Sequence, residues 1–531
     1  MRTALSPVTR WIDAVVFDLG RQMRWSFLPP LMVYFAFGCA TVATIVGTFF
    51  VKDFLDFSAA YLAGLAFWAG LPWALKMPLG HLVDLIWRWK SGLIYVGAGL
   101  VAISMGIMYL VLTQTAMMEA VAPIGTWYII SSMLAPCGLV LQDAVADAMS
   151  IEAVPVIGED GSPIPESASK NMHTTMQTLG RFALIAGTVV VALVNIVMFS
   201  GIEALSEAEK SAIYARIYLI GLIIPVISVS GVILAALQRR LGHHSTERLP
   251  DAPRTQMNPW YFIGGGAFVA LTLTIGLNDV PFGQEIIFIG SMIIVGLLMR
   301  QLIAVLPHTQ ARMLLGTALI IFFFRAVPRP GDGLTWFNID VLGFDQQFLS
   351  VLSLLTSVMT LVGLVALRPV IAKWPIVRVI ALLTIAAGIL SLPNLGLYYG
   401  VHHWTAAVTG GIVDARFIAL LDTAVESPLA QIAMIPMLAW IARSAPIELK
   451  ATFFAVMASF TNLALSASSL STRYLNEVFV VTREVREAGV VTMAADYSQL
   501  GWLLLSVIGV TVIVPLMVIW LVQRSPLRTT D

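Results

Sequence analysis

Five residues that can do chemistry lie inside long apolar stretches of this chain. Gln142, Asp143 and Asp147 share one such stretch, Lys76 lies in an earlier one, and Arg181 lies in the next. An ionised side chain in hydrocarbon costs several kcal/mol unless it faces a polar cavity or a partner, so such residues usually mark a path for a solute or a proton. Asp143 and Asp147 are four residues apart, which places them on one face of a helix.

The composition requires a membrane protein. Of 531 residues, 58% are hydrophobic and only 12% are charged, about half the charged fraction of an ordinary soluble domain. The formal net charge is zero, so nothing indicates a nucleic-acid partner. Apolar runs of roughly 18 to 25 residues recur along the chain, and each is long enough to span a bilayer as a helix.

The runs predict about fourteen transmembrane helices. We expect them near residues 29–51, 58–80, 92–113, 123–149, 174–199, 213–237, 259–278, 284–306, 312–328, 345–367, 376–395, 412–443, 450–476 and 499–522. Lys and Arg concentrate in alternate loops, which predicts that both termini are cytoplasmic.

A polar segment divides these spans. Residues 239–258 read as a cytoplasmic linker between a bundle at 29–238 and the later spans, with a lead-in at 1–28 and a tail at 524–531. Six spans, a linker and at least six more spans resemble the plan of the major facilitator superfamily, in which two six-helix bundles rock about a central site. This resemblance implies that 307–523 forms the second bundle and that 259–306 holds two inserted helices.

Three segments resemble the folate-biopterin transporter family within that superfamily. Residues 141–148, with Asp143, Asp147 and then Glu152, resemble its fourth-span signature. Lys76, Gly80 and Asp84 are similar to its second-span motif, although the family's Pro directly after the Lys is displaced here to Pro78. Pro446 with residues 451–455 and Asn462 resembles the entry to its eleventh span, and residues 324–328, with Arg325, are a fainter match to its seventh.

The resemblance implies transport of folate, pterin or another polar organic solute, coupled to protons. A pterin presents neighbouring N–H donors that suit a carboxylate such as Asp143 or Asp147, and a folate tail suits Lys76, Arg181 or Arg325. Trp68, Trp73 or Phe324 offers a flat surface for the ring. Alternatively, the carboxylates carry a coupling proton.

Other interpretations stay open. Lys76, Asp143, Asp147 and Arg181 form either a binding site or a charge network that closes a gate; Gly80, Asp84, Arg88 and Glu152 are expected at the gate. Asp422 and Glu426 are site candidates on one helical face, or Asp422 pairs with Arg416 at a helix end.

A light-harvesting or pigment-delivery assembly protein of the same superfamily is an alternative function, as is transport of an unrelated metabolite or drug. The sequence contains no catalytic, metal or cofactor motif that would predict an enzyme. The location expected is a bacterial inner or plasma membrane.

Overall fold

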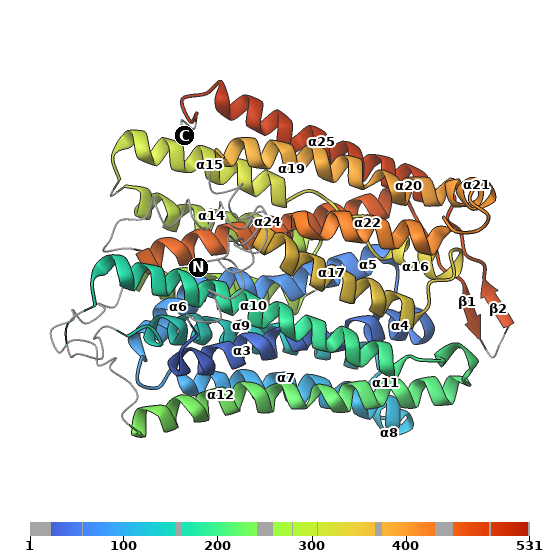
Figure 1. Ribbon diagram of the computed structural model, residues 1–531, viewed down its shortest axis with the longest axis horizontal. Helices are drawn as coiled ribbons and strands as arrows, with labels where there is room; N and C mark the ends of the chain where they lie inside the picture. The colour runs from blue at the N-terminus through green and yellow to red at the C-terminus, as the bar shows by residue number, and fades with distance from the viewer. Residues whose placement is uncertain are drawn as a thin grey trace, which may run out of the picture.

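The computed structural model shows a bundle of long helices that run alongside one another (Figure 1). It describes residues 23–55, 57–155, 162, 164–241, 259–278, 280–304, 306–366, 374–430, 450–487 and 490–528. Chain order places the first-half helices, α3 to α12, before α13 and α14, the two helices predicted to be an insertion, which we call the inserted pair; the second-half helices, α15 to α25, follow.

Among the described residues, the first half contains ten α-helices. They are α3 (Leu28–Cys39), α4 (Ala43–Phe54), α5 (Ala59–Gly70), α6 (Lys76–Leu85), α7 (Ser91–Thr113), α8 (Thr115–Glu119), α9 (Ile124–Glu152), α10 (Glu166–Met198), α11 (Glu207–Gly221) and α12 (Ile223–Arg240). Short 3-10 turns at η2 (Trp25–Phe27), η3 (Ala40–Val42), η4 (Leu71–Leu75) and η5 (Ile202–Ala204) lie between them.

The remaining elements follow the linker. The inserted pair is α13 (Pro259–Gly276) and α14 (Gly283–Ile303). The second half consists of α15 (His308–Arg325), α16 (Asp332–Asp340), α17 (Gln346–Ala366), α19 (Ile376–Leu390), α20 (Leu392–Tyr398), α21 (Val401–Val408), α22 (Ala415–Ala430), α24 (Lys450–Val478) and α25 (Leu500–Gln523). An antiparallel hairpin, β1 (Val485–Glu487) and β2 (Val490–Met493), connects α24 to α25.

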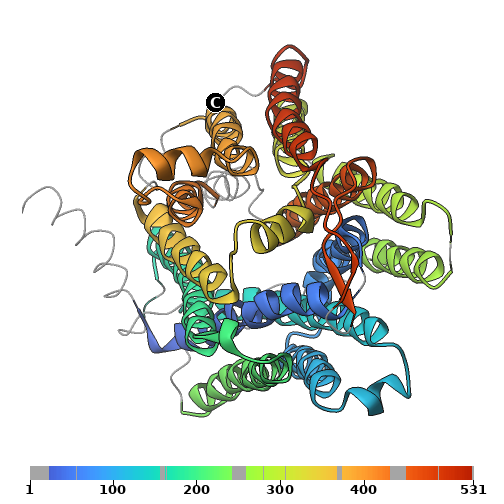
Figure 2. The ribbon, with the colours of Figure 1, turned by 90° about the vertical axis from the view of Figure 1, so that its right-hand side faces the viewer.

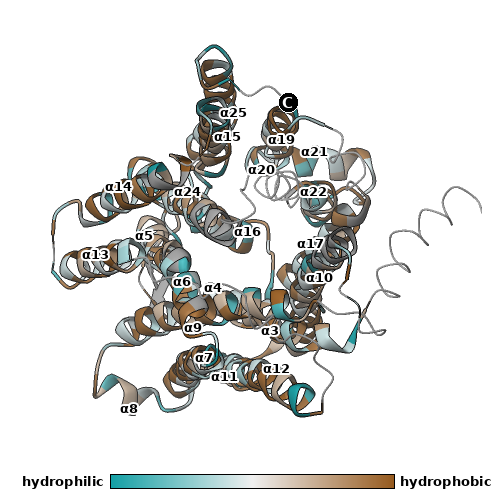
Figure 3. Ribbon diagram, turned by 90° about the vertical axis from the view of Figure 1, so that its left-hand side faces the viewer, coloured by the Kyte–Doolittle hydropathy of each residue, from teal (hydrophilic) through white to brown (hydrophobic). Residues whose placement is uncertain are grey.

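The helices have the length and surface expected for a bilayer. Ten helical stretches among the described residues are long and apolar enough to cross a membrane. Large apolar side chains stay exposed on the bundle, for example Val197 at 74% and Trp502 at 65%, and Figure 3 shows hydrophobic colour along helices at the perimeter. The chain is therefore a multi-pass membrane protein.

The count of fourteen spans is not confirmed. Of the predicted spans, 58–80, 312–328, 412–443 and 450–476 fall outside the ten stretches, although α5 to α6, α15, α22 and α24 are helical there. Residues 431–449 lie outside the described residues, as do 1–22, most of the linker (242–258) and 529–531. The domain boundaries consequently stay a prediction.

Two differences from the predicted spans matter for the site. The span at 58–80 is not one straight helix: it tightens to a 3-10 turn at η4, which contains Pro72, and resumes as α6 at Lys76. Proline has no N–H to continue the α-helical ladder, which accounts for the interruption. The hairpin at 485–493 was not predicted, because it lies in a loop between spans.

The two halves meet mainly at two places. α24 packs against α5, η4 and α6, and α10 packs against α17. Thr188 of α10 donates a hydrogen bond to Ser357 of α17 at 3.0 Å. The inserted pair lies side by side at the edge of the bundle, next to α5 and α24 (Figures 2 and 3).

Polar contacts between the halves gather at the end of the bundle that carries the hairpin, which we call the hairpin end. Lys52 at the end of α4 pairs with Asp340 at the end of α16 at 2.8 Å. Tyr214 of α11 accepts a hydrogen bond from Gln346 of α17 at 3.0 Å, and Arg483 donates to the Leu55 carbonyl. These contacts hold the halves together at that end.

Close packing of α3 on α10 depends on glycine. A Cβ on Gly187 would lie 2.4 Å from the Phe35 carbonyl oxygen, whereas a Cβ on Gly106 in α7 would meet nothing within 4 Å. We predict that Gly187→Ala lowers the free energy of unfolding by about 1–3 kcal/mol through overpacking. Gly106→Ala, the matched control, should be neutral or stabilising by up to about 1 kcal/mol. Thermal unfolding of the purified variants in detergent measures both, and equal midpoints would contradict this packing.

Candidate functional site

The site is a cluster of ions where α6, α9 and α3 meet. Lys76 Nζ lies 2.7 Å from Asp143 Oδ2 and 2.8 Å from Asp147 Oδ2, so one ammonium bridges both carboxylates. Tyr34 of α3 donates its hydroxyl to Asp147 Oδ1 at 2.7 Å. The four-residue spacing therefore does place both carboxylates towards one partner, as predicted.

Local structure fixes where these side chains lie. Lys76 is the first residue of α6, directly after the η4 turn. α9 is held on α7 by a close glycine contact, since a Cβ on Gly138 would lie 2.5 Å from the Gly97 carbonyl oxygen. Ser104 and Ser131 each donate to the other's carbonyl, at 2.8 and 3.0 Å. With α9 fixed in this way, Asp143 and Asp147 are presented to α6 and α3.

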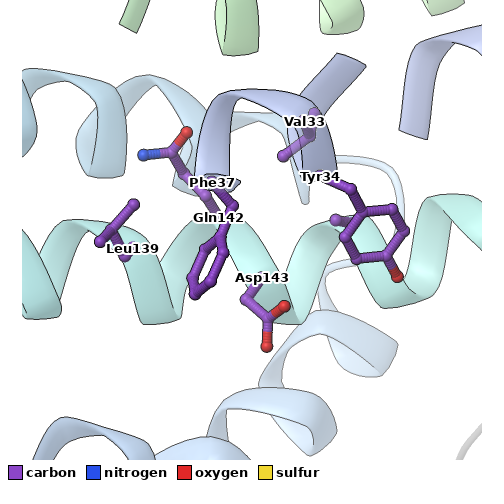
Figure 4. A pocket seen from close by; sticks show the side chains of 7 residues that line it. Val33, Tyr34, Phe37, Leu139, Gln142 and Asp143 are labelled. Atoms are coloured by element: carbon purple, nitrogen blue, oxygen red, sulfur yellow. The ribbon is translucent and has the colours of Figure 1, made fainter. Parts of the chain in front are cut away.

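A small pocket lies beside the cluster, between α3 and α9 (Figure 4). Its lining consists of Val33, Tyr34, Phe37, Leu139, Gln142, Asp143 and Ala146. Phe37 meets Trp73 edge to face, with ring centroids 5.6 Å apart. The pocket thus combines a carboxylate, an amide and a phenol with aromatic surface.

The charges in the cluster do not cancel. One ammonium and two carboxylates leave one negative charge when all three are ionised. Asp147 has two donors, Lys76 and Tyr34, whereas Lys76 is the donor that binds Asp143. The Asp143 side chain is also less exposed, at 14% against 42%. Burial and fewer donors make Asp143 the carboxylate whose charge is less well stabilised.

Arginines extend the site towards the second half. Arg181 of α10 interacts electrostatically with both Asp143 and Asp147. Arg325, the last residue of α15, lies in the electrostatic range of Arg181 and of Arg329. Arg329 follows α15 and was not among the predicted site residues. It interacts electrostatically with Glu426. Basic groups from both halves therefore approach the same region.

The other predicted site residues lie elsewhere. Asp422 accepts a hydrogen bond from Asn394 at 3.3 Å, and it experiences electrostatic repulsion from Glu426. The alternative partner, Arg416, instead binds Asp345 at 2.9 Å. Asn462 donates to the Trp73 carbonyl at 3.2 Å, which joins α24 to the η4 turn just before Lys76.

The predicted gate residues are less close to one another. Glu152 pairs with Lys90 at 2.6 Å and with Arg239 at 3.7 Å, and all three belong to the first half. Arg88 is exposed in the turn after α6, and a Cβ on Gly80 would meet nothing within 4 Å. Asp84 lies on α6, but its side chain is outside the described part of the structure. A gate role for these four residues stays a prediction.

The aromatic candidates are separated by the structure. Trp73 contacts the pocket residue Phe37. Trp68 instead lies against the inserted helix α13, where a Cβ on Gly276 would be 3.0 Å from its ring, and Phe324 packs against a hydrophobic core. Tyr34 and Phe37 were missed, because an aromatic residue in an apolar run is usually a packing residue.

The arrangement of helices is the fold of membrane transporters of the major facilitator type. Among solved structures, a POT family transporter is similar over 96% of both chains, with a TM-score of 0.61 and 13% identity. The nucleoside transporter NupG is similar over 95% of this chain and 100% of its own, with a TM-score of 0.51 and 12% identity. At these identities the likeness concerns the fold.

The sequence comparisons give the family. The BT1 family model matches residues 38–530. A folate-biopterin transporter from Synechocystis sp. is 23% identical over 483 residues, which is 88% of this chain and 79% of that protein. The chain belongs to the BT1 family.

The ion cluster can be tested by its energetics. We predict that Lys76→Met lowers the free energy of unfolding by about 3 kcal/mol, because two carboxylates are left without their ammonium. Asp143→Asn on that background should recover at least about 1 kcal/mol, which is the coupling expected of a direct pair. Thermal unfolding of the single and double variants gives this coupling.

The exposed pair Lys210 and Glu207, 2.9 Å apart, supplies the control. Lys210→Met should change the free energy of unfolding by less than about 1 kcal/mol. Simple additivity of Lys76→Met and Asp143→Asn would show that these two residues do not stabilise each other.

Proposed function

We propose that this BT1-family transporter carries folate- or pterin-like polar organic solutes by alternating access, and that transport is coupled to protons. The observation on which this rests is the Lys76, Asp143 and Asp147 cluster beside the pocket. Two carboxylates that share one lysine in a membrane protein have the capacity to take up a proton or a donor group of the cargo.

The pocket chemistry favours a flat heterocycle with adjacent N–H donors. Such an edge can donate two parallel hydrogen bonds to the Asp143 carboxylate, and Gln142 adds an amide that both donates and accepts. Phe37 and Trp73 supply apolar ring surface beside them. Arg181, Arg325 and Arg329 would bind the anionic part of a folate-like solute.

The same cluster supports a coupling mechanism. When a proton binds Asp143, this carboxyl no longer carries the charge that pairs with Lys76, and the ammonium keeps Asp147 as its partner. Proton binding thereby changes how α9 is held on α6. Since α6 continues from η4, and η4 is bound by Asn462 of α24, the change is passed to the second half.

The roles of the two carboxylates can be separated by uptake. We predict that Asp143→Asn, reconstituted in proteoliposomes with a pH gradient, reduces uptake of labelled folate or pterin by about tenfold or more, because a charge-assisted contact is lost. The thermal midpoint should change little, since Lys76 keeps Asp147. Asp147→Asn should preserve exchange of substrate with an altered apparent affinity, as expected for a residue that shifts the balance between conformations.

Glu119, an exposed residue at the end of α8, provides the matched control, and Glu119→Gln should transport normally. Unrelated dicarboxylates serve as the negative substrates. Normal uptake and normal pH dependence in Asp143→Asn would refute the assigned role.

We also propose a topology for this transporter in a bacterial inner or plasma membrane, with both termini and the 239–258 linker in the cytoplasm. The basic residues Arg239 and Arg240 end α12 at the linker, in accordance with the inside-positive bias. A tag inserted in the linker should react with an impermeant reagent only after the cytoplasmic face is opened. Labelling of intact cells at that tag would overturn the orientation.

A further inference from the structure

Tyr34 lies where three helices meet: it belongs to α3, binds a carboxylate of α9 and packs against α10. It lies on α3, is 8% exposed, and donates its hydroxyl to Asp147 at 2.7 Å. Its ring lies against α10, where a Cβ on Gly180 would be 3.0 Å from two ring carbons. The absence of a side chain at Gly180 therefore leaves room for the ring, and the ring fixes the direction of the hydroxyl.

The described charged and titratable groups that face Asp147 come from each neighbouring helix. Lys76 is on α6, Tyr34 is on α3, Arg181 is on α10, and Asp143 is on α9 itself. Lys76 and Arg181 act on both carboxylates. The two carboxylates differ in their hydrogen-bond donors. The Tyr34 hydroxyl donates to Asp147, at 2.7 Å.

We infer that Tyr34 is a positioning residue that keeps Asp147 ionised and bound to Lys76, so that the proton taken up by the cluster resides on Asp143. A hydroxyl that donates to a carboxylate favours its charged form. A hydronium ion of the solvent gives up the proton: its O–H bond breaks, an O–H bond forms on Asp143, and a water molecule is left. The neutral carboxyl is released from Lys76. The summed charge of Lys76, Asp143 and Asp147 changes from one negative to zero, and no other covalent bond is made or broken.

This inference deepens the proposed function, and it rests on that function for its meaning in transport. The location of the proton does not depend on the cargo. It can therefore be measured on the purified protein without any substrate.

Infrared difference spectroscopy of the full chain in lipid, titrated with pH, reports a protonated carboxyl group by its C=O stretching band. We expect a titrating band in the unmodified protein that is lost in Asp143→Asn and kept in Asp147→Asn. Retention of the full band in Asp143→Asn would overturn the inference. Thermal midpoints establish that both variants are folded.

The second measurement addresses Tyr34 itself. Tyr34→Phe keeps the ring against Gly180 and removes the donor. In the Asp143→Asn background, it should restore a titrating band, now from Asp147, because the hydrogen bond that favours the charged form of this carboxylate is lost. An unchanged spectrum would show that Tyr34 does not select the carboxylate.

Tyr218→Phe is the matched control, because it removes the same oxygen from a buried tyrosine of α11 in a separate hydrophobic cluster. It should restore no titrating band in the Asp143→Asn protein. If the bands behave as expected but folate and pterin are not taken up, the proposed cargo is wrong and the proton assignment stands. If no carboxyl band titrates in any variant, the proton assignment and the coupling both fail.

Discussion

The bridging of two carboxylates by Lys76 is the interaction on which the arrangement of the first half depends. Three ionisable groups in hydrocarbon would each cost several kcal/mol alone, and the cost falls only if they meet within hydrogen-bonding distance. That condition requires α6 to begin where Lys76 can reach α9 and requires α9 to present residues 143 and 147 on the same face. The interruption at η4 and the close contact of Gly97 with Gly138 serve this requirement.

Much of the fold could be predicted from the sequence because its cause is local. Run length and hydropathy identify spans, and the 143/147 spacing identifies a shared face, which Lys76 does bridge. The η4 interruption was less visible, since Pro72 and Pro78 are tolerated in membrane helices. The hairpin at 485–493 pairs residues whose alternation is weak in a polar loop.

The charged members of the site were the easiest to predict. A charge in an apolar run is rare, so Lys76 and Asp143 could be recognised directly, and Gln142 and Trp73 were candidates as well. Tyr34 and Phe37 depend on which helix faces which, and no spacing along the chain gives that information. Arg329 follows a helix end, where a basic residue is ordinary, and its relation to Arg325 and Glu426 appears only in three dimensions.

Lys76 alone does not balance two carboxylates, so the electrostatic state of the cluster also depends on the other charged groups near it, among them Arg181. The pocket is built from α3 and α9, both of the first half, so binding there affects the second half only through contacts between the halves. Two such contacts are direct: Asn462 binds the carbonyl of Trp73, three residues before Lys76, and Thr188 of α10 binds Ser357. The first of these contacts lies next to the cluster, because α6 begins at Lys76 directly after the turn that Asn462 of α24 binds.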